Sequence, residues 1–201
     1  MKKRQLKGSQ KLTKAKSKRI EHRKVLIAAE GTNTEPQYFE GLAKVLNAKA
    51  VRVLSVSTVG VGRDPLRIIT EADRRRKLEL KSGDGFDEVW AVLDVDRHAN
   101  LEPACIRARK LLIDVAISSP CFEIWLVWHY EEWAKWSKGK TLQDLLKRSH
   151  GFKNKNLPHN FPYANYELAV ARAEKCEVAT KVYAPPNPHS SVSALVRRLN
   201  L

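Results

Sequence analysis

Short apolar runs alternate with helical patterns along this chain, and that alternation most constrains its fold. Four runs have the length and apolar character of buried strands, at residues 25–29, 51–57, 89–93 and 113–117. Helix starts lie between them. Thr34 is expected to be an N-cap that forms a capping box with Gln37, and Asp64-Pro65 opens a second helix. The pattern predicts an α/β fold with a mainly parallel sheet flanked by helices.

The C-terminal part is expected to be helical. Residues 121–128 are apolar all round, which predicts a buried helix. A polar, helical stretch follows, with loops near 151–165 and 184–188. Val192, Leu195, Val196 and Leu199 have the spacing of one helix face, so an amphipathic helix is predicted at the end of the chain.

Charge divides the 201 residues into two unequal parts. The whole chain has 37 Lys and Arg against 22 Asp and Glu, a net charge of +15. Residues 1–24 contain eleven of the bases and one acid, so they carry +10 and leave +5 for residues 25–201. We therefore expect a disordered basic tail at 1–24 that favours polyanions such as nucleic acid, followed by one domain at 25–201.

Several classes of protein are disfavoured by composition. No apolar run approaches the length of a membrane span, and no hydrophobic stretch follows the basic N-terminus as in a secretory signal. Cys105, Cys121 and Cys176 are far apart and form no CxxC pair. These features predict a cytoplasmic protein without a membrane partner, a disulfide framework or a structural zinc site.

Acidic residues follow two of the predicted strands. Glu30 comes directly after the first strand, and Asp94 and Asp96 come after the third. If these strands are neighbours, the three carboxylates converge at the carboxyl edge of the sheet, where open parallel sheets bind their ligands. Carboxylates so close together repel one another unless a cation lies between them, and Mg²⁺, or Mn²⁺ in its place, suits such oxygen ligands.

The segments around these acids resemble the RloB-like family. The matching residues are Glu30–Phe39 (EGTNTEPQYF), Asp94–His98 (DVDRH), Ser118–Leu126 (SSPCFEIWL) and Asn187-Pro188 with Ser191-Val192. Two positions depart from the family's pattern. Ser119 stands where Asn is usual, and His189 stands where a small residue is usual.

The resemblance implies a Toprim-type nuclease of phage-defence and abortive-infection systems, working beside an ATPase of the ABC or overcoming-lysogenization-defect type. Together with the spacing, it implies Mg²⁺-dependent cleavage of a phosphodiester in DNA or RNA. Asp94 and Asp96 would be metal ligands. Glu30 would be either a ligand or the general acid/base, and the sequence leaves that choice open.

Four further residues have both a functional and a structural interpretation. Glu35 belongs to the first motif, but an acid is also favoured in the first turn of a helix. Arg97 and His98 adjoin the DxD motif and are candidates for contact with the scissile phosphate, or are simply exposed loop residues. Glu123 is either a site residue or a support for the first turn of the buried helix. His129 is interpreted as a hydrogen-bonded core histidine.

Two other functions compete with the nuclease. A non-catalytic nucleic-acid-binding subunit would keep the same fold but would not need three adjacent carboxylates. A phosphatase of the haloacid dehalogenase type carries its DxD after the first strand, whereas here it follows the third.

Overall fold

A five-stranded sheet with helices on both faces forms the body of the protein. The computed structural model describes residues 23–48, 50–56, 64–95, 101–154, 156–176, 183 and 185–200. The strand order is β2-β1-β3-β4-β5. The α/β class and the mainly parallel sheet predicted from the sequence are therefore confirmed. Residues 1–22 of the predicted tail lie outside the described residues.

The first four strands run parallel, and β5 runs antiparallel to β4. Their bounds are β1 Val25–Ala29, β2 Val51–Ser55, β3 Glu88–Asp94, β4 Asp114–Ser119 and β5 His189–Ser190. The sequence predicted the first four within two residues at each end. It did not predict β5, because a two-residue strand that follows a proline-rich segment has no periodicity of its own.

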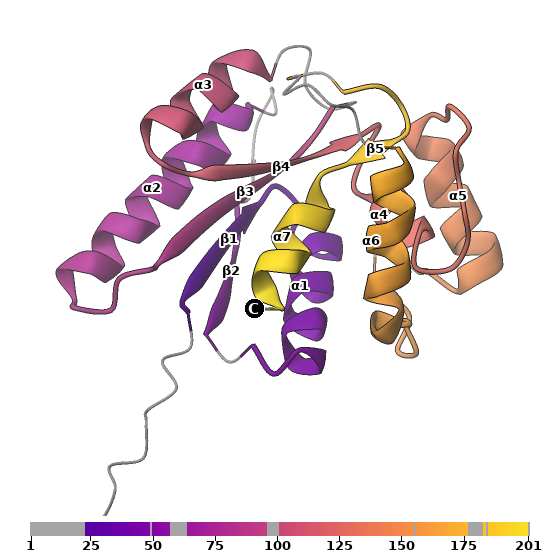
Figure 1. The fold of residues 1–201 in the computed structure, drawn as a ribbon, viewed down its shortest axis with the longest axis horizontal. Coiled ribbons are helices and arrows are strands. Elements are labelled where there is room, and N and C mark those ends of the chain that lie inside the picture. The colour runs from indigo at the N-terminus through magenta and orange to yellow at the C-terminus, as the bar shows by residue number, and fades with distance from the viewer. Residues whose placement is uncertain are drawn as a thin grey trace, which may run out of the picture.

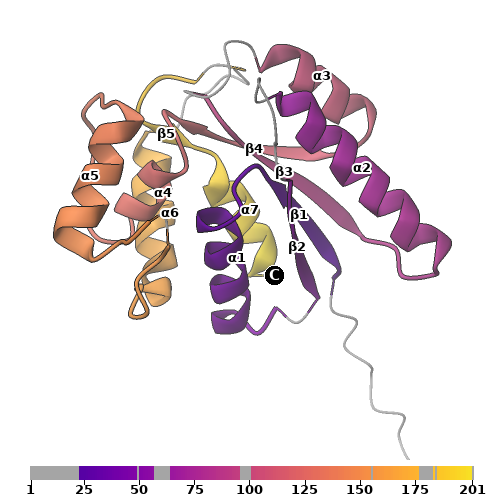
Figure 2. The same cartoon turned by 180° about the vertical axis from the view of Figure 1, so that it is seen from behind.

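The helices divide between the two faces of the sheet (Figures 1 and 2). Their bounds are α1 Thr34–Val45, α2 Pro65–Lys81, α3 Glu102–Lys110, α4 Glu123–Val127, α5 Gly139–His150, the 3₁₀ turn Tyr163–Asn165, α6 Tyr166–Lys175 and α7 Val192–Leu199. Helices α2 and α3 cover one face, and α1 and α7 cover the other. Helices α4, α5 and α6 form a group beside α1 and α7 (Figure 1).

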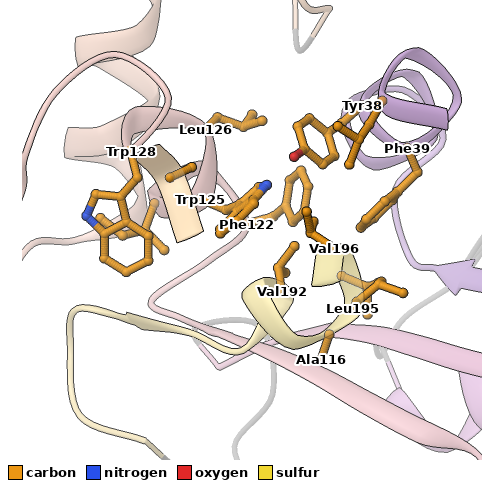
Figure 3. Close-up of a cluster of buried hydrophobic side chains, with 14 of the residues drawn as sticks. Tyr38, Phe39, Ala116, Phe122, Trp125, Leu126, Trp128, Val192, Leu195 and Val196 are labelled. Carbon is orange, nitrogen blue, oxygen red and sulfur yellow. The ribbon is translucent and has the colours of Figure 1, made fainter. Parts of the chain in front are cut away.

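Each face of the sheet has its own hydrophobic core. Alternate residues of the strands point to opposite faces, so neighbours in β1 and β3 belong to different cores. Under α2 and α3 the buried side chains are almost all aliphatic, including Leu26, Ile68 and Ile69. Under α1, α4 and α7 the core is rich in aromatic residues, and Figure 3 shows Tyr38, Phe122 and Trp125 gathered above α7.

The capping box predicted at Thr34 is wrong. Helix α1 begins at Thr34 itself, and Asn33 at the N-cap position makes no side-chain cap bond. The Gln37 side chain instead crosses to a distant loop, where its amide donates to Asn156 Oδ1 (2.7 Å) and accepts from the Leu157 backbone N–H (3.0 Å). A tertiary contact has replaced the local one.

The second helix start is confirmed. The Asp64 carboxylate accepts a hydrogen bond from the Leu66 backbone N–H at 2.9 Å, and Pro65 occupies the first helical position of α2. An N-cap acceptor followed by proline satisfies the free N–H groups of a helix start without cost to the helix.

Two residues assigned to the tail contact the body. The Lys24 backbone N–H donates to Asp87 Oδ2 at 2.7 Å, and Arg23 forms an ion pair with Glu88 at 2.9 Å. Their placement shows that ordered contacts begin at least two residues before β1. Within the described ranges, no helix is both long enough and apolar enough to cross a bilayer.

Candidate functional site

Glu30 and Asp94 lie at the carboxyl ends of two adjacent parallel strands. Ala29 of β1 is in register with Val92 of β3, so Glu30 follows the pair by one residue and Asp94 by two. Both side chains are buried, with 8% of Glu30 and 4% of Asp94 exposed. The two strand ends therefore lie side by side at one edge of the sheet, and the convergence of the three carboxylates themselves stays a prediction. This edge is where an open parallel sheet binds its ligands.

Asp94 is flanked on its other side by β4. It pairs in register with Ser118, and the Val95 backbone N–H donates to the Ser118 carbonyl at 2.9 Å. The Ser118 and Ser190 hydroxyls lie 2.9 Å apart and are both buried, which ties β4 to β5. Asp94 thus sits on an inner strand whose two neighbours fix its backbone.

Asp96, Arg97 and His98 lie outside the described residues. Within the described ranges, no three Asp, Glu, His or Cys side chains are close enough together to hold a metal ion. Glu30 and Asp94 nevertheless offer buried carboxylate oxygens on neighbouring strands. Hard oxygen donors of this kind suit Mg²⁺, which keeps waters and substrate oxygens in the rest of its shell.

The carboxylate of Glu35 lies against Gly31. A Cβ atom added to Gly31 would lie only 1.9 Å from Glu35 Oε2, so the carboxylate of Glu35 occupies the space that a larger residue at position 31 would need. Glu35 is itself buried in the first turn of α1. A larger residue in place of Gly31 would therefore displace the Glu35 carboxylate from this position.

Glu123 is the first residue of α4 and is 6% exposed. Its Oε1 accepts a hydrogen bond from Gln143 Nε2 of α5 at 2.9 Å. Its Oε2 is buried and receives no hydrogen bond from any residue that the structure describes. The Gln143 contact links α4 to α5, which goes beyond support for the first turn of α4.

Two cavities meet at Thr34 and Glu123. The smaller one, of about 60 Å³, lies at the carboxyl end of β1 and is lined by Gly31–Glu35, Phe122 and Glu123. The larger one, of about 320 Å³, is lined by Thr34, Glu123, Gln143, Leu146, Lys147, Phe152 and Asn154. We call the larger cavity the α4–α5 groove. It lies between the first residues of α1 and α4 on one side and α5 with its following loop on the other.

The aromatic core holds α1 and α4 together beneath this groove. Tyr38 of α1 has its ring centroid 5.6 Å from that of Phe122 and 6.2 Å from that of Trp125, in edge-to-face contacts. His129 Nε2 lies 3.0 Å from the Tyr38 hydroxyl, and its ring is fully buried. The prediction of a hydrogen-bonded core histidine is confirmed.

Burial sets the protonation of this pair. Burial, reinforced by the positive charge of Arg172, lowers the pKa of His129 to about 3. Burial raises the pKa of Tyr38 well above its ordinary value. Both side chains are therefore neutral near pH 7, and they stabilise the packing of α1 against α4 without introducing charge.

The two positions that depart from the family pattern face each other. Ser119 pairs in register with His189 across the antiparallel β4–β5 contact. The peptide bonds Ser119-Pro120 and Asn187-Pro188 are cis, so both strands adjoin a cis-proline. The sequence showed two separate departures, whereas the structure shows a single cross-strand pair.

The residues on the far wall of the groove were not found from the sequence. Gln143, Lys147, Phe152 and Asn154 lie in a polar stretch of α5 and in the loop after it, and they match no motif. Only the tertiary packing of α5 against α4 brings them opposite Thr34 and Glu123. Trp125 and Trp128 are fully buried, whereas 66% of Trp136 is exposed.

The comparisons with known proteins give one match. The model of the RloB-like protein family matches residues 25–199, which is most of the chain. No curated protein and no solved structure matches the chain.

Proposed function

The chain belongs to the RloB-like protein family, and we propose that it is a Mg²⁺-dependent nuclease of the Toprim type that acts in antiphage defence. The observation that supports this best is the placement of Glu30 and Asp94. They are buried carboxylates at the ends of adjacent parallel strands, within one residue of each other in register. A fold that only needed stability would gain little from two buried acids at one edge.

Glu30, Asp94 and Asp96 would hold the metal, and Mn²⁺ would substitute for Mg²⁺. When bound, the ion would supply positive charge for the scissile phosphate and for the leaving oxygen. As an alternative to the ligand role, Glu30 would be the general acid/base that exchanges a proton with the attacking water. Both roles of Glu30, ligand and general acid/base, remain within the proposal.

The groove beside this edge favours a polyanionic substrate. Lys147 lines it, and Arg148 and Lys153 are exposed nearby on α5 and its following loop. The basic segment at 1–24 adds further positive charge. DNA and RNA both fit this charge, and contacts to their phosphates supply affinity that falls steeply with salt.

The test is cleavage of labelled single-stranded DNA, duplex DNA and RNA by the purified protein, alone and with the ABC-type or overcoming-lysogenization-defect-type ATPase that we propose as its partner. We expect cleavage with Mg²⁺ or Mn²⁺ and none in EDTA. Asp94→Asn keeps the shape of the side chain and removes its charge. It should lower the cleavage rate by about a thousandfold, since a metal contributes several kcal/mol to such a transition state.

Asp73→Asn is the matched control. Asp73 is also a buried aspartate, but it lies on α2 and is paired with Arg76 (2.6 Å) and Lys77 (2.7 Å). This variant should lose stability and keep its cleavage rate. Equal loss of cleavage in both variants would reject the assigned site. Nucleic-acid binding without cleavage under any of these conditions would favour the non-catalytic subunit instead.

The defence role has its own test in cells. Expression of the chain with the proposed ATPase partner in a bacterial host should reduce phage plating, and Asp94→Asn should restore it. Restored plating in that variant with unchanged protein level would connect the carboxylate to defence. Protection that persists in Asp94→Asn would contradict the connection.

A further inference from the structure

The carboxylate of Glu123 has an acceptor oxygen that the fold leaves unused. Oε1 accepts from Gln143, but Oε2 is buried and receives no hydrogen bond within the described ranges. A buried acceptor without a donor costs free energy, and more so when it is charged. Glu123 also borders both cavities, so a donor group of a ligand seated there would reach the neighbourhood of this carboxylate.

The α4–α5 groove has the size and lining of a site for a flat, polar ring. Its volume of about 320 Å³ lies at the lower end of the usual range for ligand sites. Leu146 and Phe152 supply apolar surface, and Gln143 and Asn154 supply amides that both donate and accept. Lys147 supplies a positive charge at the exposed side. Apolar surface, amides and one cation together suit a nucleotide.

We infer that the α4–α5 groove binds one unpaired nucleobase of the substrate strand and prefers a base with an exocyclic amino group. This inference rests on the proposed function. On binding, the Glu123 carboxylate turns so that Oε2 faces the groove and accepts from the amino group of adenine, cytosine or guanine. The apolar side chains contact the ring, and Lys147 contacts the adjoining phosphate. Bases of this kind satisfy the acceptor that has no donor among the described residues.

Thymine and uracil are disfavoured by the same carboxylate. Their pairing edge presents two carbonyl oxygens around a single N–H, and these oxygens repel a buried negative charge. The pairing edge of a base is available only where the strand is unpaired. The inference therefore also states that the substrate strand is single-stranded, or locally opened, at this groove.

The experiment measures binding without cleavage. Short labelled homopolymers of deoxyadenylate, deoxycytidylate and deoxythymidylate are titrated with the Asp94→Asn protein in EDTA, and fluorescence anisotropy is recorded. The adenine and cytosine polymers should bind about tenfold more tightly than the thymine polymer, as expected for one charge-assisted hydrogen bond. Adding Glu123→Gln should abolish this preference, because the amide both donates and accepts.

Two further variants complete the test. Glu71→Gln changes a glutamate on α2, across the sheet, where it pairs with Arg74, and it should keep the preference. Lys147→Ala should weaken all three polymers by a similar factor. The inference is overturned if the thymine polymer binds as tightly as the others or if the preference survives Glu123→Gln.

The outcomes separate this inference from the proposed function. If the protein cleaves nucleic acid but binds the three polymers equally tightly, the nuclease proposal is supported and the base site is rejected. If the base preference depends on Glu123 but the protein never cleaves nucleic acid, the base site is supported and the nuclease proposal is rejected. If Glu123→Gln instead raises the Mn²⁺ concentration needed for cleavage and leaves the preference unchanged, Glu123 serves the metal and the base site is rejected.

Discussion

The two faces of the sheet are built differently. Under α2 and α3 the core is aliphatic, and the nearby charges are neutralised in ion pairs such as Asp73 with Arg76. Under α1, α4 and α7 the core is rich in aromatic residues (Figure 3). It also contains the neutral His129–Tyr38 pair. We call the face covered by α2 and α3 the scaffold face. The second face positions α1 and α4, whose first turns carry Glu35 and Glu123.

The difference between the two cores indicates which one fixes the relative orientation of helices near the candidate site. Aliphatic side chains pack well in several arrangements, whereas edge-to-face rings and buried hydrogen bonds fix relative orientation. Tyr38 contacts both Phe122 and Trp125 in this way, so α1 cannot shift against α4 without breaking several directed contacts. We therefore expect mutations in the aromatic core to disturb the site as well as the stability.

The largest expected effect compares Trp125→Ala with Ile69→Ala. Both side chains are fully buried, and the tryptophan should cost about 3–5 kcal/mol and the isoleucine about 2–4 kcal/mol in the free energy of unfolding. Urea unfolding measures both. The discriminating measurement is nucleic-acid binding at a temperature where each variant is folded. Binding should fall in Trp125→Ala alone, and an equal fall in Ile69→Ala would remove the distinction between the faces.

The second prediction concerns pH. The folded pKa of His129 is about 3, below the ordinary value of 6.5. Between these values His129 is protonated in the unfolded chain but not in the folded chain. The free energy of unfolding therefore falls as pH falls below 6.5. The slope is about 1.4 kcal/mol per pH unit, which gives a loss of about 3 kcal/mol by pH 4.

His129→Gln should flatten that slope. Glutamine can still bond to the Tyr38 hydroxyl but does not titrate. Urea unfolding of both proteins at several pH values between 7 and about 4 measures the difference. Parallel slopes in the two proteins would mean that His129 is accessible to protons in the folded state.

A third prediction compares two glycines. Gly83 has a left-handed φ of 79° and open space around it, so Gly83→Ala should cost about 1 kcal/mol in stability and leave cleavage unchanged. Gly31→Ala would displace the Glu35 carboxylate, the flexible end of a side chain, at little cost in stability. It should lower cleavage by about tenfold or more. Melting temperatures and cleavage rates of both variants are the measurements, and the reverse ranking would contradict the account.

The smallest expected effect lies on the scaffold face. Asp64→Ala removes the N-cap of α2 and should cost about 1 kcal/mol without changing cleavage. Asp64→Asn keeps an acceptor at the cap and serves as the control. A lower cleavage rate in folded Asp64→Ala would show that the scaffold face is coupled to the site.

Much of the fold could be predicted from local sequence. The apolar run at Val25–Ala29 and the Asp64-Pro65 start depend on neighbouring residues, and both were found correctly. The buried helix predicted within residues 121–128 is also found, as α4 Glu123–Val127. Helix α3 ends at Lys110, and Leu112 just beyond it takes a left-handed φ of 54° that no local pattern indicates.

The candidate site was only partly predictable, for a physical reason. Glu30 and Asp94 follow strands, and parallel topology brings such positions to one edge. The groove wall on α5 depends on how α5 packs against α4, which no short-range pattern encodes. Gln37 illustrates the same limit, because its side chain forms a hydrogen bond with Asn156, 119 residues away in sequence, instead of the predicted local capping bond.

The central claim is that Glu30 and Asp94 together bind a divalent metal, and a direct titration with Mn²⁺ tests it without any nuclease assay or partner. Free Mn²⁺ is followed by electron paramagnetic resonance for the wild type and for Glu30→Gln, Asp94→Asn and Asp73→Asn. We predict binding by the wild type and by Asp73→Asn, with affinity at least about tenfold weaker in Asp94→Asn and reduced in Glu30→Gln. Unchanged Mn²⁺ affinity in folded Asp94→Asn would contradict the account.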